Sequence, residues 1–314
     1  MSEAAVVRVA AAILVRRDGR VLLAQRLAGT PYPGYWEFPG GKLEPDETPH
    51  DALARELGEE LGIAVTRAAS WLVQRHVYPH ADVELNFFRV FAWQGDPHGR
   101  DGQAIVWQDP AAIEVGPLLP ANAAVLRALA LPPIYAITMA EDVGEEVFLE
   151  RAQVAIDGGV RLIQLREKSF APQRLVALGR RLALLAAPQG ARILLNGDER
   201  SARLLGFAGV HWTAARLVAA RQRPDDMLCA ASTHDAAELA RAAALGVDFA
   251  VLGPVCATPS HPGAAPLGWP RFAELVRGSP LPVYALGGLV TADLDTAIAC
   301  GAHGVALRRA AWPA

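Results

Sequence analysis

The sequence has little cysteine and no excess of charge of one sign, and both absences exclude classes of protein. Its three cysteines, Cys229, Cys256 and Cys300, are too few and too widely spaced for a disulfide framework or a zinc site. The 30 basic and 33 acidic residues give a net charge of −3 and are spread along the chain. Because no basic stripe offers a surface to a phosphate backbone, we expect no duplex nucleic acid as a partner.

Long hydrophobic runs are missing as well. No stretch of about 18 apolar residues occurs, and the first residues do not join a basic segment to a long apolar run. We therefore expect a cytoplasmic protein with no membrane partner. The chain is still apolar enough, at 52% hydrophobic residues over 314 positions, to bury a large core. Its length predicts roughly two domains of about 150 residues each.

The pattern of apolar residues changes at Pro132-Pro133. Before it, residues 7–26 predict a strand, a turn at Asp18-Gly19 and a second strand, and residues 81–94 predict another strand after one helix. After it, eight short apolar strands alternate with helical segments, which favours a closed (β/α)8 barrel, with an open doubly wound sheet as the alternative. We predict an α/β chain with domains at residues 1–132 and 133–314.

A helix is well signalled in the first domain. Thr48, Pro49 and Asp51 are typical of an N-cap, a first helical position and a reciprocal carboxylate, and the helix is predicted to run to Gly62. An apolar stripe repeats along it every four residues, at Leu53, Leu57 and Leu61. This stripe predicts the face that packs on the core.

A second face of this helix carries Glu56, Glu59 and Glu60. Like charges three and four residues apart repel, so a purely structural helix would gain from replacing one of them with lysine. A hard cation such as Mg²⁺ takes oxygen ligands and bridges carboxylates to phosphates. The preceding Gly40-Gly41-Lys42 adds glycines that allow close backbone approach and a lysine suited to a phosphate. A solvated acidic helix is the alternative interpretation.

The segment that begins at Gly41 resembles the Nudix hydrolase signature at every fixed position. It contains Glu47 and ends in "RELGEELGI", which begins at Arg55. The flanking "WEFPGGK" is similar to the MutT type of that family. The resemblance covers about 130 residues. It implies a Nudix α/β/α sandwich that hydrolyses a nucleoside diphosphate linked to another group.

The resemblance also implies the cofactor and the roles of residues. The metal, Mg²⁺ with Mn²⁺ as an alternative, would be held by Glu56, Glu59 and Glu60 with the Gly40 carbonyl. Arg55 would orient the glutamates, and Glu47 would be structural or would assist. Which glutamate is the general base stays open. MutT-type enzymes carry a further loop glutamate, whose aligned position here is read as Val106, with Asp101 as a substitute.

Substrate choice depends on a second set of matches. The segment "LLPANAAVLRAL" resembles the MutT segment in which an asparagine reads an oxidised purine, which implies that role for Asn122. Arg26, Phe38 and Lys42 match positions that line the nucleotide or its phosphates. The alternatives are an N-cap role for Asn122 and core packing for Phe38. Together these matches favour a nucleoside triphosphate, 8-oxo-dGTP, hydrolysed to 8-oxo-dGMP and pyrophosphate, over a sugar nucleotide.

The second domain resembles thiamine-phosphate synthase and its TenI-like relatives. The resemblance rests on "IYAIT", "GGVRLIQLREK", "GVHW", "STHD", "VLGPVCATPSHPG" and "YALGGL". It implies a barrel site that includes Gln164, Arg166 and Lys168, which alternate at one strand end, and Asn196. A synthase carries a metal-binding aspartate where this chain has Gly197 and a lysine where it has His261. We therefore expect no synthase activity.

Other activities of the barrel stay open. His234 matches the histidine of a TenI-like thiazole tautomerase, which needs no metal, and an imidazole is suited to proton transfer near neutral pH. Gly287 and Gly288 are candidates for a late-strand phosphate site. A thiamine-pathway phosphate is the implied ligand. A barrel that only binds such a ligand, and thereby regulates the hydrolase, is the alternative.

Overall fold

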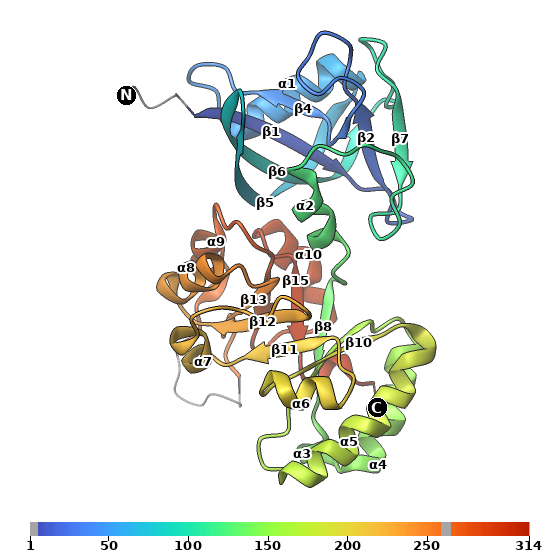
Figure 1. The fold of residues 1–314 in the computed structure, drawn as a ribbon, viewed down its shortest axis with the longest axis vertical. Coiled ribbons are helices and arrows are strands. Elements are labelled where there is room, and N and C mark those ends of the chain that lie inside the picture. Colours follow the sequence, from blue (N-terminus) through green and yellow to red (C-terminus); the bar gives the residue numbers. More distant parts are fainter. Residues whose placement is uncertain (1–5, 259–264, 314) are drawn as a thin grey trace. The chain divides into compact units, whose positions relative to one another are not determined.

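The computed structural model describes residues 6–258 and 265–313. The chain forms two compact units, one that runs to Ala130 and also takes in Arg277–Pro280, and one that contains the remaining residues from Leu131 on (Figure 1). In the described part of the chain, no helix is long and apolar enough to cross a membrane.

The described residues of the first unit form two sheets and two α-helices. The larger sheet has the order β4-β1-β6-β5 and the smaller one the order β3-β2-β7. The strands are β1 (Val7–Leu14), β2 (Val21–Gln25), β3 (Trp36–Glu37), β4 (Gly40–Lys42), β5 (Ala64–Tyr78), β6 (Ala81–Gln94) and β7 (Ile105–Gln108), and the helices are α1 (Pro49–Leu61) and α2 (Asn122–Leu129). The two helices contact opposite sheet faces. Along β1, Ala10 and Ala12 share a core cluster with α1, whereas Ala11 and Ile13 share one with α2.

The strand, turn and second strand predicted over residues 7–26 are present, but β1 and β2 belong to different sheets. They are connected by a single bridge, Val15 to Val21. A strand has only two edges for hydrogen bonding, and those of β1 are occupied by β4 and β6. The second strand therefore pairs in the smaller sheet.

Helix α1 begins and ends where the sequence predicts. The Thr48 hydroxyl accepts a hydrogen bond from the Asp51 backbone N–H at 3.2 Å. Gly62 ends the helix in the left-handed conformation, at φ +68°, which costs glycine little. The leucine stripe of α1 is fully buried, at Leu53, Leu57 and Leu61.

The second unit is a closed barrel of eight parallel strands. They are β8 (Ile134–Ile137), β9 (Leu162–Leu165), β10 (Arg192–Leu195), β11 (Gly209–Trp212), β12 (Leu228–Thr233), β13 (Phe249–Leu252), β14 (Val283–Leu286) and β15 (Gly304–Leu307). The last strand pairs with the first, β15 with β8, so the alternative of an open sheet is wrong.

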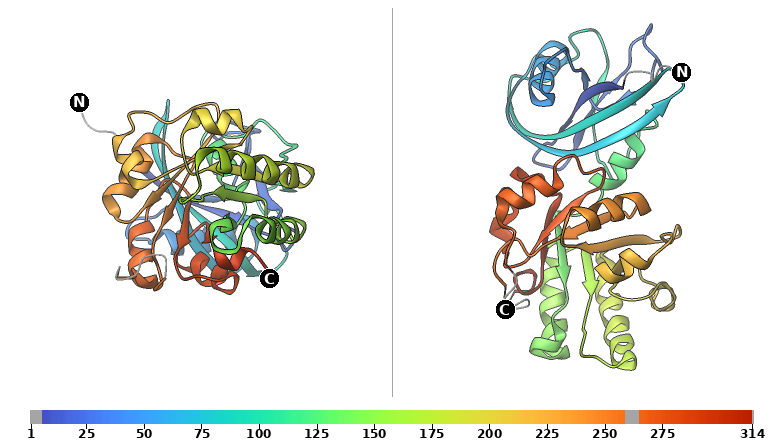
Figure 2. Two further views of the ribbon diagram at one scale, coloured as in Figure 1. Left: turned by 90° about the horizontal axis from the view of Figure 1, so that it is seen from below. Right: turned by 90° about the vertical axis from the view of Figure 1, so that its left-hand side faces the viewer.

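Helices cover the outside of this barrel (Figure 2). They are α3 (Ala140–Val143), α4 (Glu145–Asp157), α5 (Pro172–Ala186), α6 (Glu199–Leu204), α7 (Ala214–Ala219), α8 (Ala236–Leu245), α9 (Gly268–Val276) and α10 (Leu294–Ala299). Side chains including Tyr135, Phe249 and Tyr284 fill the interior. The barrel is therefore a packed core whose strand ends are available for a site.

Candidate functional site

The first candidate site lies where β4 meets α1. A Cβ atom built on Gly41 would lie 2.2 Å from the carboxyl carbon of Glu56, closer than any real contact. Gly40 is as tightly placed, since a Cβ there would lie 2.1 Å from the Ala10 carbonyl oxygen, and its φ is +140°. The glycine pair is thus required for the backbone of β4 to lie against β1 and against the Glu56 carboxylate.

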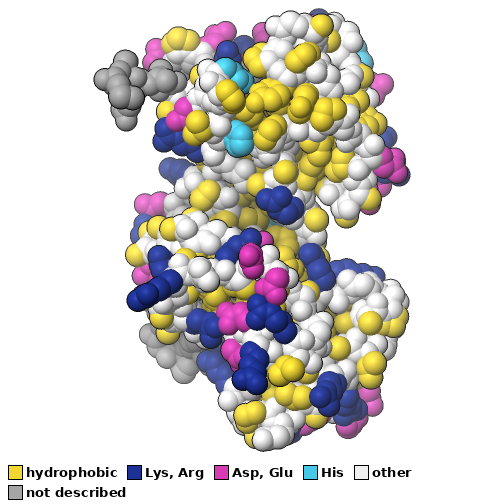
Figure 3. Space-filling model, viewed as in Figure 1, with side chains coloured by type: hydrophobic (Ala, Val, Ile, Leu, Met, Phe, Trp, Pro, Cys, Tyr) yellow, Lys and Arg dark blue, Asp and Glu magenta, His cyan; other side chains and the backbone are white. Residues whose placement is uncertain are grey.

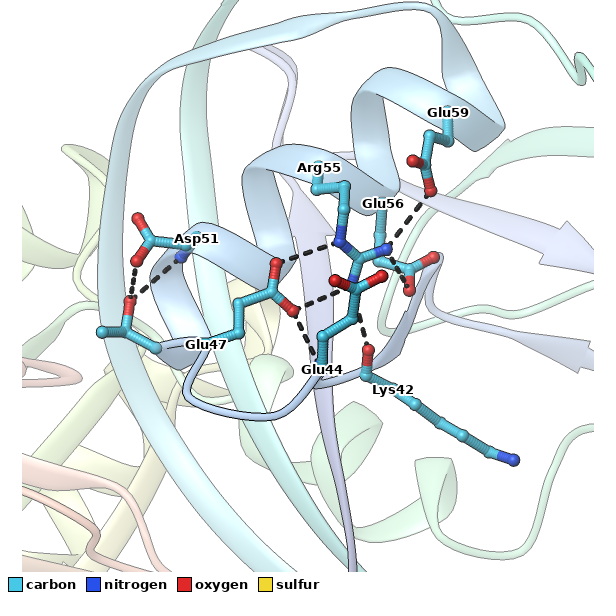
Figure 4. A network of polar contacts seen from close by, with 8 residues as sticks. Lys42, Glu44, Glu47, Asp51, Arg55, Glu56 and Glu59 are labelled. Atoms are coloured by element: carbon cyan, nitrogen blue, oxygen red, sulfur yellow. Dashed lines mark hydrogen bonds and ion pairs between the residues drawn. The ribbon is translucent and has the colours of Figure 1, made fainter.

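Arg55 gathers the carboxylates around this point (Figure 4). Its Nε and Nη2 donate to the two oxygens of Glu47, each at 2.9 Å. Its Nη1 donates to Glu56 Oε1 at 2.9 Å and to Glu59 Oε2 at 3.2 Å. Nη2 also donates to the Lys42 carbonyl at 3.0 Å, while the Lys42 side chain extends away from the network. The guanidinium therefore connects α1, β4 and the loop that precedes the helix.

Glu60 lies on the same side of α1 and is mostly buried. Its Oε2 accepts a hydrogen bond from the Gly40 N–H at 3.2 Å. Burial raises the pKa of Glu60 to about 7 against the lowering effect of that hydrogen bond, and the charges of Glu56, Glu37 and Asp101 raise it further. The site thus holds more negative charge than its own residues neutralise.

This donor set fits a hard divalent cation, which takes carboxylate and carbonyl oxygens. As placed, however, Glu56 and Glu59 are turned toward Arg55, and the Glu59 side chain is 63% exposed. Within residues 6–258 and 265–313, no three acidic, histidine or cysteine side chains converge as metal ligands. Metal binding would require Glu59 to turn from Arg55 toward Glu56 and Glu60.

A cavity of about 500 Å³ opens beside these carboxylates. Its lining includes Gly40, Gly41, Lys42, Glu60 and Asp101. The cavity therefore has a negatively charged side that also offers one lysine.

The predicted substrate residues are only partly brought together. Arg26 lines the cavity, as Lys42 does. Phe38 is 3% exposed, packs edge-to-face on Phe87 and is absent from the described lining. Asn122 is 4% exposed and also absent from that lining, and its Nδ2 has no hydrogen-bond partner among the described residues. Ala121, not Asn122, is the N-cap of α2, so the N-cap alternative is wrong.

Several lining residues were missed in the sequence. Arg26 Nη1 donates to both oxygens of Glu37, at 2.6 and 2.7 Å. Burial raises the pKa of Glu37, and Arg26 opposes the shift. The rings of Tyr32, Tyr78 and His80 lie 5.4 to 5.9 Å apart at the same cavity. Of the missed residues, Glu37 alone stands in a motif quoted from the sequence, "WEFPGGK".

Asp101 and Val106, the two positions considered for the loop acid, lie in different surroundings. Asp101 lines the cavity, and its charge acts on Glu60. Val106 lies on β7 and packs against the core cluster that contains α2. Of the two positions considered for the loop acid, Asp101 is therefore the one that lines the cavity, and its role there stays a prediction.

A second cavity, of about 540 Å³, lies at the carboxyl ends of the barrel strands. All seven residues proposed for the barrel line it, namely Gln164, Arg166, Lys168, Asn196, His234, Gly287 and Gly288. His234 is 55% exposed, and its Nδ1 lies 2.9 Å from Glu238 Oε2. His261 lies outside the described residues.

A hydrogen-bond chain in the wall of this cavity was not foreseen. Gln164 Nε2 donates to the Tyr135 hydroxyl at 3.2 Å, and that hydroxyl lies 3.1 Å from His211 Nδ1. His211 Nε2 lies 2.8 Å from Ser232 Oγ, which lines the cavity. Burial, with the charge of Arg166, lowers the pKa of His211 to about 3, so the imidazole is neutral.

Comparisons with known proteins agree with this division. Residues 6–129 match the family described as NUDIX domain, and residues 134–311 match the family described as Thiamine monophosphate synthase. The 8-oxo-dGTP diphosphatase of Haemophilus influenzae is 39% identical over 124 residues, which cover 40% of this chain and 91% of that protein. The putative thiamine-phosphate synthase of Geobacter sulfurreducens is 36% identical over 178 residues, covering 55% of this chain and 84% of that protein. The chain belongs to both families.

The Nudix half is similar to more than one kind of enzyme. The CTP pyrophosphohydrolase of Escherichia coli is 43% identical over 123 residues, which cover 37% of this chain and 87% of that protein. The first unit is thus a Nudix-type hydrolase, and the second is a barrel of the thiamine-phosphate synthase family. On the face drawn in Figure 3, acidic and basic side chains are mixed.

Proposed function

We propose that the Nudix unit is a Mg²⁺-dependent diphosphatase that converts 8-oxo-dGTP to 8-oxo-dGMP and pyrophosphate, and so removes an oxidised nucleotide before DNA replication. The observation that carries this proposal is the Arg55-centred set of glutamates beside a cavity that Lys42 lines. Relatives from Haemophilus influenzae and Proteus vulgaris, the latter 40% identical over 98 residues, bear the name 8-oxo-dGTP diphosphatase.

The residues of the site divide the work of hydrolysis. Mg²⁺, or Mn²⁺ in its place, would neutralise the diphosphate and acidify a bound water. Glu56, Glu59 and Glu60, with the Gly40 carbonyl, would hold it. Arg55 keeps Glu56 beside Gly41, and Glu47 fixes Arg55 from the other side. Glu60 is partly buried and accepts a hydrogen bond from the Gly40 N–H, and its raised pKa would suit it to take a proton from the attacking water.

Recognition of the base would fall to other residues in and near this cavity. The flat surfaces of Tyr32, Tyr78 and His80 are suited to an aromatic ring, and the Arg26–Glu37 pair offers donors beside an acceptor. Asn122 has a buried amide N–H₂ that lacks a partner in the described structure. An amide that donates and accepts suits the carbonyl and N–H of an oxidised purine.

A second candidate is hydrolysis of another nucleotide, and one observation favours it. The Escherichia coli relative named CTP pyrophosphohydrolase has a higher identity, 43%, than the Haemophilus influenzae relative, 39%. Asn122 is also absent from the described cavity lining. A pyrimidine triphosphate or a sugar nucleotide is therefore the competing substrate.

For the barrel, we infer that thiamine-phosphate synthesis is not its reaction. The described lining of its cavity contains no Asp or Glu, and Gly197 follows Asn196 where the family resemblance implies a metal-binding aspartate. A Mg²⁺-diphosphate would find no carboxylate ligand in that described lining. Binding of a thiamine-pathway phosphate as a regulator, or thiazole tautomerisation through His234, are the remaining functions. A changed rate of nucleotide hydrolysis on adding a thiazole phosphate would favour regulation.

Pyrophosphate release from 8-oxo-dGTP, dGTP and CTP by the full-length chain tests the proposal, with Mg²⁺ and with chelator. We expect a metal-dependent preference for 8-oxo-dGTP of at least tenfold in kcat/KM. Metal-dependent hydrolysis that favours CTP would support the second candidate. Absence of hydrolysis of all three would refute the assignment of a nucleoside triphosphatase.

A further inference from the structure

The loop between β6 and β7 is bound to the C-terminal end of α1. The Arg100 backbone N–H donates to the Glu60 carbonyl at 2.9 Å, and the His98 backbone N–H donates to the Leu61 carbonyl at 3.2 Å. The Arg100 side chain adds a hydrogen bond from Nη1 to the Gly58 carbonyl at 3.0 Å. Because the last carbonyls of a helix have no partner within the helix, this loop supplies partners for three of them. The loop is therefore fixed to the helix that carries the glutamates of the first site.

Gln103 joins this loop to α1 through both ends of its amide. Its Nε2 donates to the Glu60 carbonyl at 3.0 Å, and its Oε1 accepts from the Asp101 backbone N–H at 2.9 Å. A carboxamide can donate and accept at once, and both capacities are used here. The Glu60 carboxylate is held separately, by the Gly40 N–H at 3.2 Å. Gln103 therefore connects the backbone of Asp101 to the backbone of Glu60.

A tight turn places Asp101 beside this connection. A Cβ atom built on Gly99 would lie 2.0 Å from the Gln103 carbonyl oxygen, so the chain can turn this closely only because residue 99 is a glycine. The Gly102 N–H closes the turn by donating to the Gly99 carbonyl at 3.3 Å. Asp101 lies within the turn, and it lines the same cavity as Gln103 and Glu60. The turn thus brings a third acidic side chain, besides those of Glu37 and Glu60, to that cavity.

We propose that Gln103 is a positioning residue of the hydrolase, which holds the Asp101 carboxylate beside Glu60. This inference rests on the proposed function of the Nudix unit. Asp101 is exposed, so its own packing does not fix it. A group that takes part at a reaction site has to be held within about 0.5 Å of its working position. Through Asp101, Gln103 would contribute to the affinity of the site for its divalent cation.

Hydrogen exchange of the full-length chain in chelator tests the connection itself. Gln103→Met keeps the length of the side chain and removes both amide hydrogen bonds, so we expect exchange in residues 98–103 to become about three- to tenfold faster. Gln153→Met is the matched control, since Gln153 donates to Asp157 on α4 and lines neither described cavity. Unchanged exchange in residues 98–103 of the Gln103→Met protein would overturn the proposal.

Binding of Mn²⁺, followed by electron paramagnetic resonance, measures the consequence for the cation without hydrolysis. Gln103→Met and Asp101→Asn should each weaken binding about tenfold or more, as losses of groups that support a metal site do. The variant with both changes should bind no more weakly than Asp101→Asn alone, because the two side chains act through one carboxylate. Gln153→Met should bind as the parent does.

Losses of Mn²⁺ affinity that add in the double variant would show that Gln103 acts on the fold rather than through Asp101, and would overturn the proposal. Parental affinity in a folded Gln103→Met protein would do the same. The proposed function fails on a different result: a parent protein that binds Mn²⁺ but hydrolyses no nucleoside triphosphate would refute it, while the Mn²⁺ affinities would still decide the role of Gln103. A parent that binds no Mn²⁺ would refute both.

Discussion

Replacing Gly41 with alanine would test the position of the Glu56 carboxylate. The new Cβ would lie 2.2 Å from that carboxyl group, whereas ordinary contact begins near 3.4 Å, so the carboxylate must move by about 1 Å. The backbone of Gly41 is not left-handed, so alanine is compatible with it. The group that must move is the Glu56 carboxylate, which ends a flexible side chain and forms a partly exposed ion pair with Arg55. The free energy of unfolding should therefore change by only about 0–1 kcal/mol.

The effect on catalysis should be much larger. A displacement of about 1 Å at a reacting group can lower the rate about 100-fold, which corresponds to about 2.7 kcal/mol in the activation barrier. Pyrophosphate release with Mg²⁺ measures kcat, and urea unfolding measures stability on the same samples. Gly58→Ala is the matched control on α1, since its nearest described neighbour is 3.8 Å away and alanine favours a helix by up to about 1 kcal/mol. A Gly41→Ala protein with nearly normal kcat would refute the placement of Glu56 at the reaction.

Three further outcomes are expected. Glu56→Gln should lose most hydrolysis, on the order of 100-fold or more, while its circular dichroism and melting temperature stay close to those of the parent. In chelator, the raised pKa of Glu60 means that between about pH 4.5 and pH 7 the folded state keeps a proton that the unfolded state has lost. The contribution of Glu60 to the free energy of unfolding is therefore complete below about pH 4.5 and is lost as the pH rises through about 7. Glu60→Gln should remove that loss, and parallel urea curves for parent and variant over this range would contradict the shift. Asn122→Ala should lower the preference for 8-oxo-dGTP over dGTP about tenfold or more in kcat/KM if its amide reads the base, whereas equal losses on both substrates would indicate a packing role.

Some features were predictable from the sequence because their causes are local. Helix α1 begins where the Thr48 hydroxyl caps the Asp51 N–H and ends at Gly62, which is in the left-handed conformation. The barrel was predictable because strands buried on both faces lack polar alternation, and β8 to β15 repeat that pattern eight times. The clustering of Gln164, Arg166 and Lys168 followed from their shared strand end.

Other features depend on contacts between distant segments, which no local pattern encodes. The divergence of β1 and β2 follows from the pairing of β1 with β4 and β6. Glu37 reaches the cavity because β3 pairs with β2, which places it beside Arg26. The same holds for Arg308, which lines the barrel cavity because β15 pairs with β8. Phe38 and Asn122 lie deeper than their motifs suggested.

Closure of the barrel through β15 and β8 has a consequence for the order in which the chain folds during synthesis. The Trp312 indole donates to the Ile137 carbonyl at 2.7 Å across 175 residues, so the barrel cannot close until that distant segment leaves the ribosome. All strands and helices of the Nudix sandwich are synthesised by Leu129. At about 5–20 residues per second, the sandwich has on the order of ten seconds or more to form while the barrel is still open. Chains stalled near residue 250 should therefore yield a protease-resistant sandwich and a degraded barrel, whereas equal resistance of both would show that the barrel forms before it closes.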